Sequence, residues 1–316
     1  MTTHRLPATP DTVHWGYFDA ALPPRLTIRS GDTVEVECVS GHRSVLPPPG
    51  SGFAIPPALS AINDRLVPEL GAHILTGPIA IEGAEPGDML EVQIEEITLG
   101  ADWGFCMVRP LAGTLPEDFP TFRVLHIPAD RERMTCRMPW GTELPLAPFF
   151  GVMGVAPPPI YGRIPSNPPR EHAGNLDLKE LVAGSTLYLP VHVPGAKFSV
   201  GDGHGVQGDG EVCINALEMC LDGRLTFRLH KKPGATPLLT FPRAETPTHW
   251  ISIGLNEDLD LAMKQALREM ITFICARTNL SPLDAYQFCS LAADFRVTQT
   301  VNGVKGVHGM LRKDLL

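Results

Sequence analysis

The chain has 316 residues, a formal net charge of −9 and a hydrophobic fraction of 43%, enough for one large or two modest domains with a sizeable core. The negative charge disfavours nucleic acid and acidic membrane surfaces as partners, because both are recognised by basic faces. No window holds the ~20 uninterrupted apolar residues of a membrane-spanning helix, and Met1 to Arg25 has no signal-peptide core. We therefore expect a cytoplasmic protein that acts on a small molecule.

The cysteine, proline and glycine contents indicate a reduced, strand-rich protein. The seven cysteines are odd in number and form no Cys-x-x-Cys pair, which is typical of core thiols rather than of a disulfide framework. The 32 prolines and 30 glycines are spread between apolar segments. Because both residues concentrate in turns, this distribution predicts many short strands.

Alternating apolar and polar residues predict strands in the first half of the chain. Residues 25–39 alternate on both sides of Ser30-Gly31-Asp32, which predicts an antiparallel pair. The Pro- and Gly-rich residues 40–57 form a predicted loop over a site. Pro86 and Gly87 suit the two central positions of a type II turn between further strands.

The second half contains further strands and then changes to helices. Asp222-Gly223 between apolar runs predicts a hairpin. Apolar residues fall on one helical stripe from Leu259 to Ile274, with Asn256 as the expected N-cap. Ser281 before a proline predicts the start of a second helix. Residues 295–307 return to the alternation of a strand.

These elements predict a mixed, β-rich α+β fold. We expect an antiparallel β-sandwich or barrel body over residues 1–240, which carries the functional segment. Residues 241–316 are expected to form a C-terminal section of helices and strands that packs on the same core.

The segment from Gly201 to Glu211, which we expect to form a loop between two strands, is the strongest candidate for chemistry, with five glycines, three acids and one histidine in eleven residues. Ordering so many glycines costs much conformational entropy on folding, and a bound cation would offset this cost by holding the segment in place. In extended backbone Asp202 and His204 point the same way, and a turn would bring Glu211 round to them. Carboxylate with imidazole suits zinc or a similar divalent metal, with Asp177 as a further ligand. The alternative is an ordinary Asp-Gly surface turn.

Other catalytic patterns are weaker. The dinucleotide pattern formally present at residues 203–208 is rejected, because no capped helix follows it and the nearby acids would repel a pyrophosphate. Gly-x-Ser-x-Gly and His-Glu-x-x-His are missing from the sequence. His73 is an isolated candidate, for which a structural role is favoured.

Several motifs resemble those of the acetamidase/formamidase family of amide hydrolases, and they occur in family order. They are Thr-Gly-Pro-Ile-Ala-Ile-Glu-Gly-Ala-Glu-Pro-Gly-Asp at 76–88, Gly-Val-Met-Gly-Val-Ala-Pro at 151–157, Gly-Asn-Leu-Asp at 174–177, Gly-Asp-Gly-His at 201–204, Gln-Gly-Asp-Gly-Glu at 207–211 and Ser-Leu-Ala-Ala-Asp-Phe-Arg-Val at 290–297. The resemblance implies hydrolysis of short aliphatic amides, such as formamide or acetamide, to ammonia and a carboxylate. It also implies a β-rich fold, a metal at the site and a homo-oligomer of two or more subunits.

The resulting hypothesis is hydrolysis by a metal-activated water. Asp202 and His204, with Asp177, hold a divalent cation, with zinc expected first and calcium or another metal as alternatives. Glu211 moves the proton, although it could instead be a ligand. Asn175 and Gln207 are expected to bind the substrate amide, since each offers a donor and an acceptor.

Two further functions remain open. One is metal-dependent hydrolysis of a different C–N bond, in a carbamate or a larger amide. The other is a non-catalytic binding protein that a metal stabilises.

Overall fold

The computed structural model describes residues 1–235 and 238–316. It contains the helices α1 (Pro57–Arg65), α2 (Leu259–Arg277) and α3 (Pro282–Ala292). The strands are, in chain order, β1 (Thr3–Leu6), β2 (Val13–Trp15), β3 (Tyr17–Asp19), β4 (Leu26–Ile28), β5 (Thr33–Cys38), β6 (Ile74–Ile81), β7 (Met89–Val108), β8 (Arg123–Asp130), β9 (Thr135–Arg137), β10 (Glu143–Pro145), β11 (Phe149–Gly154), β12 (Arg163–Pro165), β13 (Ala173–Asn175), β14 (Thr186–Pro190), β15 (Phe198–His204), β16 (Glu218–His230), β17 (Arg243–Glu245), β18 (His249–Asn256), β19 (Ala293–Gln299) and β20 (Lys305–Arg312).

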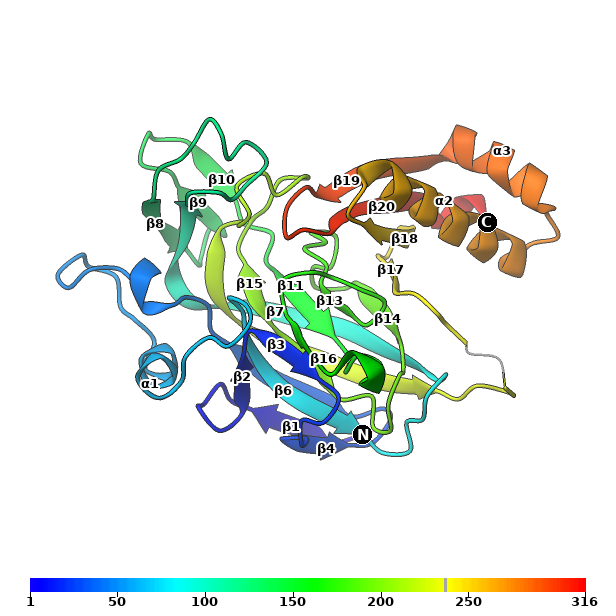
Figure 1. The fold of residues 1–316 in the computed structure, drawn as a ribbon, viewed down its shortest axis with the longest axis horizontal. Coiled ribbons are helices and arrows are strands. Elements are labelled where there is room, and N and C mark those ends of the chain that lie inside the picture. The colour runs from blue at the N-terminus through cyan, green and yellow to red at the C-terminus, as the bar shows by residue number, and fades with distance from the viewer. Residues whose placement is uncertain (236–237) are drawn as a thin grey trace.

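The body of the molecule is a large, mainly antiparallel sheet arrangement, which confirms the β-rich α+β class. The two long strands β7 and β16 pair over most of their length, and β5 and β14 extend the sheet beside them. Strand β15 pairs with β11, β6 and β16. Figure 1 shows β8 to β10 and the C-terminal elements as two projections from this body.

Two of the expected strand connections are wrong. Strands β4 and β5 form where expected, but β4 pairs in parallel with β6, whereas β5 pairs with β1 and β16. The hairpin expected at Asp222-Gly223 does not form, because β16 runs through both residues. A Cβ on Gly223 would lie 2.6 Å from the ring of Phe150, so this glycine allows close packing rather than a turn.

The turn at Pro86-Gly87 is confirmed. The Asp88 amide donates to the Glu85 carbonyl oxygen over 3.0 Å, and Gly87 has a φ of 92°. These are the features of the type II turn that the sequence predicts.

Both C-terminal helices are confirmed, with one correction to a cap. Asp258, not Asn256, caps α2, and its side chain accepts from the Leu261 amide. Asn256 instead ends β18, and its side-chain oxygen accepts from the Asp258 amide. Ser281 caps α3 as expected. Helix α1 was not predicted and begins at the end of the Pro- and Gly-rich segment.

The C-terminal elements form a small layered unit. Strand β20 pairs with β18 and β19, and α2 packs directly against β18. Strand β17 links this unit to the body, because it pairs with both β14 and β18. The division at residue 240 stays a prediction.

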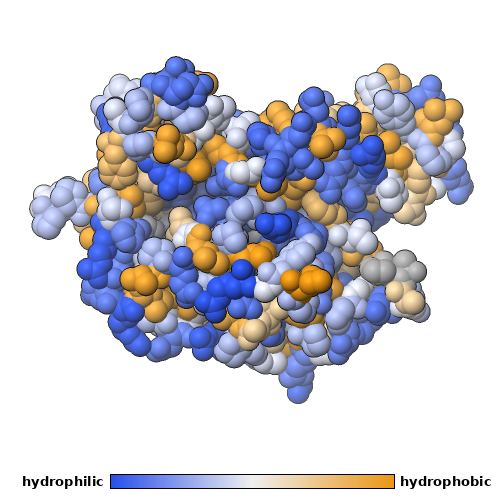
Figure 2. All heavy atoms as spheres, viewed as in Figure 1, coloured by the Kyte–Doolittle hydropathy of each residue, from blue (hydrophilic) through white to orange (hydrophobic). Residues whose placement is uncertain are grey.

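Polar and apolar side chains are mixed on the face seen in Figure 2. In the part of the chain that the structure describes, no helix is both long enough and apolar enough to cross a membrane.

We expect Asp32 to stabilise the fold in a pH-dependent way. Its carboxylate accepts from the Thr2 and Arg29 amides over 2.8 and 3.1 Å, and these bonds lower the pKa of Asp32 to about 2. A carboxyl whose pKa is lowered by folding stabilises the protein above its unfolded pKa of about 3.9 and loses this effect as the pH falls towards 2.

Asp32→Asn should therefore reduce the free energy of unfolding by about 1–3 kcal/mol at pH 7, with a smaller difference from the wild type at pH 3. Urea unfolding at the two pH values measures this, and Asp11→Asn, on an exposed ion pair with Arg65, is the control. An Asp32→Asn effect of the same size at both pH values would contradict the expectation.

Candidate active site

The glycine-rich segment begins as a buried strand. The expected loop is wrong for Gly201 to His204, which form the end of β15 and are buried. A Cβ on Gly203 would lie 2.5 Å from the Met219 carbonyl oxygen in the neighbouring strand β16. Glycine is needed here because the strands lie so close together, and not because a loop must be flexible.

Gly151 of β11 provides the space in which the site residues meet. A Cβ there would lie 2.6 Å from Asp202 Oδ2, 2.7 Å from Asp177 Oδ1 and 2.8 Å from His204 Cε1. Any side chain at this position would push these groups apart. The site is therefore built around a missing side chain in the segment 151–157.

Three acidic residues of the site have unusual backbone conformations. The φ angles are 49° at Asp177, 57° at Asp202 and 44° at Glu211. Residues other than glycine seldom adopt positive φ, and such conformations persist only where the surrounding structure imposes them. Their concentration here indicates that backbone strain is used to direct these carboxylates.

His204 lies at the centre of the site and is fully buried. Its Nε2 is 3.1 Å from Glu218 Oε1 and 3.3 Å from Asp202 Oδ2, and its Nδ1 is 2.9 Å from Gln207 Oε1. The ring of Phe149 contacts the imidazole edge to face. Burial opposes a charge on His204, but the neighbouring Glu218 and Asp202 raise the pKa of His204 well above its usual range. A cation that binds at Nε2 must therefore displace a proton.

Two overlapping groups of side chains could hold a metal ion. They are Asp177 with His204 and Glu211, and Asp202 with His204 and Glu218, and in each group the ligand atoms lie within 4.8 Å of one another. Among the described residues, Asp177 Oδ1, Glu211 Oε2 and His204 Nε2 are buried without a hydrogen-bond partner. Buried polar atoms without partners are costly, and a proton or a cation would satisfy them.

The carboxyl groups of this cluster differ in their proton affinity. Burial raises the pKa of Glu211 to about 8 and that of Glu218 to about 7. Burial, followed by the nearby Glu211, also raises the pKa of Asp177 well above its usual range. Burial opposes the charge on Asp202 as well, but His73 and His204 hold the pKa of Asp202 below its usual range.

His73 belongs to the site, contrary to the structural role favoured from the sequence. Its Nδ1 is 2.8 Å from Ser166 Oγ, and its Nε2 is 3.8 Å from Asp202 Oδ2. Burial lowers the pKa of His73, while the charge of Asp202 acts in the opposite direction. It immediately precedes β6, which pairs with β15 and so brings it to Asp202.

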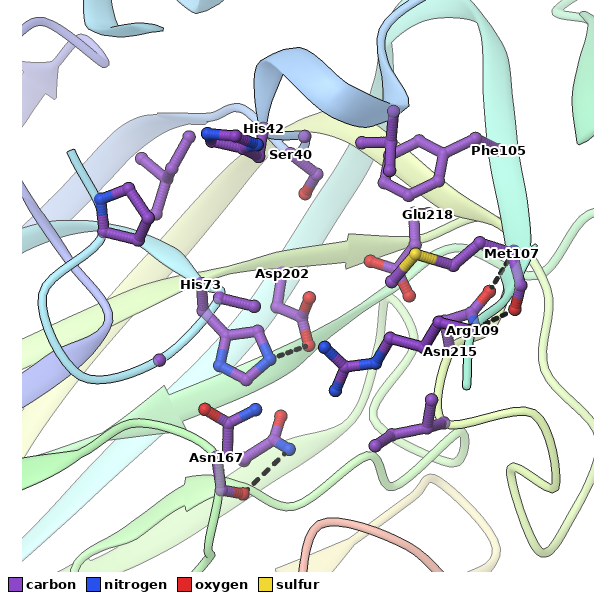
Figure 3. A pocket seen from close by; sticks show the side chains of 18 of the residues that line it. Ser40, His42, His73, Phe105, Met107, Arg109, Asn167, Asp202, Asn215 and Glu218 are labelled. Atoms are coloured by element: carbon purple, nitrogen blue, oxygen red, sulfur yellow. Dashed lines mark hydrogen bonds and ion pairs between the residues drawn. The ribbon is translucent and has the colours of Figure 1, made fainter. Parts of the chain in front are cut away.

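A cavity of about 540 Å³ opens above this cluster. Figure 3 shows His73 on one side of it, Asp202 and Glu218 in the middle, and Phe105 and Met107 on the other side. Asn175 and Glu211 also line the cavity. A substrate can therefore reach the acidic groups from solvent.

The two expected substrate-binding amides differ in their contacts. Asn175 donates through Nδ2 to the Asn167 carbonyl oxygen over 3.0 Å, while its Oδ1 is buried and has no partner among the described residues. Gln207, in contrast, contacts His204 through Oε1 and donates through Nε2 to the Asp177 carbonyl oxygen over 2.7 Å. Both ends of Gln207 are thus engaged by the site itself, and only Asn175 has an oxygen left for a ligand.

The C-terminal section completes the site. Asn302 donates to Asp177 Oδ2 over 3.2 Å and to Gln299 Oε1 over 3.0 Å. Gln299 donates in turn to the Asn175 carbonyl oxygen. Residues more than a hundred positions apart therefore fix Asp177.

Residues 4–160 and 164–307 match the sequence profile of the Acetamidase/Formamidase family. The chain belongs to this family. It is 28% identical to a formamidase from Methylophilus methylotrophus, over 80% of this chain and 77% of the relative. It is 27% identical to an acetamidase from Mycolicibacterium smegmatis, over 63% of this chain but only 61% of the relative.

A solved structure shares the whole fold. The crystal structure of an acetamidase from Bacillus halodurans is 32% identical, superimposes with a TM-score of 0.84, and the match covers 98% of each chain. The fold described above is therefore shared with a solved acetamidase over nearly the whole length of both chains.

Sequence reasoning missed Glu218. The residue stands between apolar neighbours in a segment expected to be a strand. Acidic residues are rarely buried unless they have a partner or a function. The apolar neighbours of Glu218 in the sequence were therefore the signal that could have identified it.

We expect Gly151→Ala to disrupt the cluster while the fold is kept, because the new methyl group would stand where the carboxylates of Asp177 and Asp202 meet. Metal content after loading with Zn²⁺ should fall by about tenfold or more. The matched control is Gly208→Ala, since a Cβ there has nothing within 4 Å. Wild-type metal content in Gly151→Ala would show that the space at residue 151 does not matter.

Proposed function

We propose that this member of the acetamidase/formamidase family hydrolyses aliphatic amides at the cluster around His204. The observation that carries the proposal is the set of buried ligand atoms without partners on Asp177, His204 and Glu211, directly beneath a cavity that substrate can enter. The names of the relatives, formamidase and acetamidase, support the amide bond as the target. The products would be ammonia and a carboxylate.

The residues present fit a divalent cation. One imidazole and several carboxylates, without a thiolate, form a donor set that suits zinc and similar ions. We propose Asp202, His204 and Asp177 as ligands, and zinc as the first candidate metal. When bound, such an ion supplies a lowered pKa for water and polarisation of a carbonyl group.

Glu211 is proposed as the group that moves the proton. Its Oε2 is buried and unpartnered, and burial raises the pKa of Glu211 to about 8, which suits proton exchange near neutral pH. It would accept a proton from the attacking water as the new C–O bond forms. It would then deliver that proton to the amide nitrogen as the C–N bond breaks.

The remaining residues would position the reacting groups. Asn175 Oδ1 would accept a hydrogen bond from the substrate amide. Gln207 would orient His204 through its contact with Nδ1, a positioning role in place of the substrate contact expected from the sequence.

Hydrolysis of a larger amide or a carbamate at the same residues is the second candidate, and the size of the cavity favours it. We also propose a homo-oligomer. Leu283, Tyr286 and Leu291 support this, because these large apolar side chains of α3 are exposed in the single chain.

Removal of the metal should abolish activity and weaken the fold. Without a cation, the buried carboxyl groups must take up protons or repel one another, and the stabilisation due to binding is lost. Elemental analysis, melting temperature, and ammonia release from formamide and acetamide should be measured before and after chelation, and after Zn²⁺ is restored. A chelated, metal-free protein that retains full turnover would refute the metal-assisted reaction.

Glu211→Gln separates a proton-transfer role from a ligand role. If Glu211 moves the proton, the variant should bind metal normally and lose about 10²-fold or more in kcat. Asp209→Asn is the control, since Asp209 is an exposed neighbour that pairs with Lys179, and it should remain active. A loss of metal from Glu211→Gln would instead make Glu211 a ligand.

A further inference from the structure

The cavity is larger than formamide or acetamide requires. Its volume is about 540 Å³, whereas four non-hydrogen atoms need roughly 120 Å³ if each takes the ~30 Å³ of a water molecule in the liquid. Cavities of several hundred Å³ usually accommodate larger organic ligands. A substrate that fills this one carries a further group beyond its amide.

The end of β7 forms the wall opposite the acidic cluster. Since side chains alternate along a strand, Phe105, Met107 and Arg109 face the same side, and all three line the cavity. Asn215 fixes this wall, because it exchanges hydrogen bonds of 2.8 and 2.7 Å with the Met107 backbone. The wall is therefore fixed at Met107, and Arg109, which directly follows β7 and is exposed, adds a positive charge to it.

Arg109 is directed into the cavity and has no anionic partner there. Figure 3 shows its side chain extending from the end of β7 towards Asp202 and His73. No carboxylate of the described residues lies within 4.0 Å of its guanidinium, and it donates no hydrogen bond to them. Its positive charge nevertheless acts on the site, because after burial it is among the groups that lower the pKa of His73.

The acid towards which Arg109 extends is engaged by other residues. Asp202 faces His204 and His73, so the guanidinium is left for a group that arrives from solvent. Among the described residues that line the cavity, Arg109 is the only arginine or lysine. One guanidinium matches the single charge and two oxygens of a carboxylate, whereas a doubly charged phosphate would leave a negative charge uncompensated beside the acids.

We propose that the preferred substrate is an aliphatic amide that also carries a carboxylate. This inference rests on the amidase function proposed above. Arg109 binds the carboxylate, the methylene groups lie against Phe105 and Met107, and the amide reaches the cluster around His204. Half-amides of short dicarboxylic acids have this chemistry.

The test compares each half-amide with its methyl ester, which has nearly the same shape but no charge. Ammonia release by the metal-loaded enzyme is measured for the half-amides of malonic, succinic, glutaric and adipic acid, and for formamide and acetamide. The readout is kcat/KM for the half-amide divided by kcat/KM for its methyl ester. This ratio does not depend on the fraction of folded enzyme. The variants are Arg109→Gln and, as a control, Arg228→Gln, which changes an exposed arginine of β16 outside the cavity lining.

We expect the wild-type ratio to reach about tenfold or more for at least one chain length, as a charge-assisted hydrogen bond would give. The ratio should fall towards one in Arg109→Gln and stay high in Arg228→Gln. Turnover of neutral amides with a ratio near one at every length, or a high ratio that Arg109→Gln leaves unchanged, would overturn this inference and leave the amidase function standing. No ammonia from any amide, formamide and acetamide included, would overturn both.

Discussion

Four carboxyl groups and two imidazoles lie close together beneath the cavity, and the repulsion among those carboxyls is the constraint on which the site depends. Burial alone would keep every one of them neutral. The arrangement divides them instead: Asp202 stays ionised beside His73 and His204, while Glu211 and Glu218 hold protons into the neutral range. Such a cluster is ready to exchange protons for a cation.

The strand framework holds these groups together against their repulsion. Strands β11, β15 and β16 lie close enough that Gly151 and Gly203 cannot carry side chains. Positive φ angles turn three of the acidic residues towards the common centre. The energy needed for this strain comes from the extensive buried core around the sheet. The packing of the strands therefore stabilises the fold and also holds the site residues in place.

Local patterns in the sequence predicted what is local in the structure. The stripe of α2 and the cap of α3 depend on neighbours along the chain, and the structure contains both. Asp202 and His204 do meet, but Asp202 has a φ of 57° instead of the extended backbone that the spacing argument assumed. Strand partners could not be predicted, because pairing such as that of β4 with β6 depends on contacts between distant segments. For the same reason His73 was undervalued and Glu218 was missed. The glycines of β15 suggested a loop because composition alone cannot distinguish flexibility from close approach.

The contact between Asn302 and Asp177 means that Asp177 is oriented by a residue that the ribosome adds much later. The ribosome produces the acids and His204 well before residues 299–302, so these carboxyls exist for a time without the hydrogen bonds that later orient Asp177. For the cation proposed above, binding before residues 299–302 are made would involve a loose set of ligands, and binding after folding would involve a rigid set.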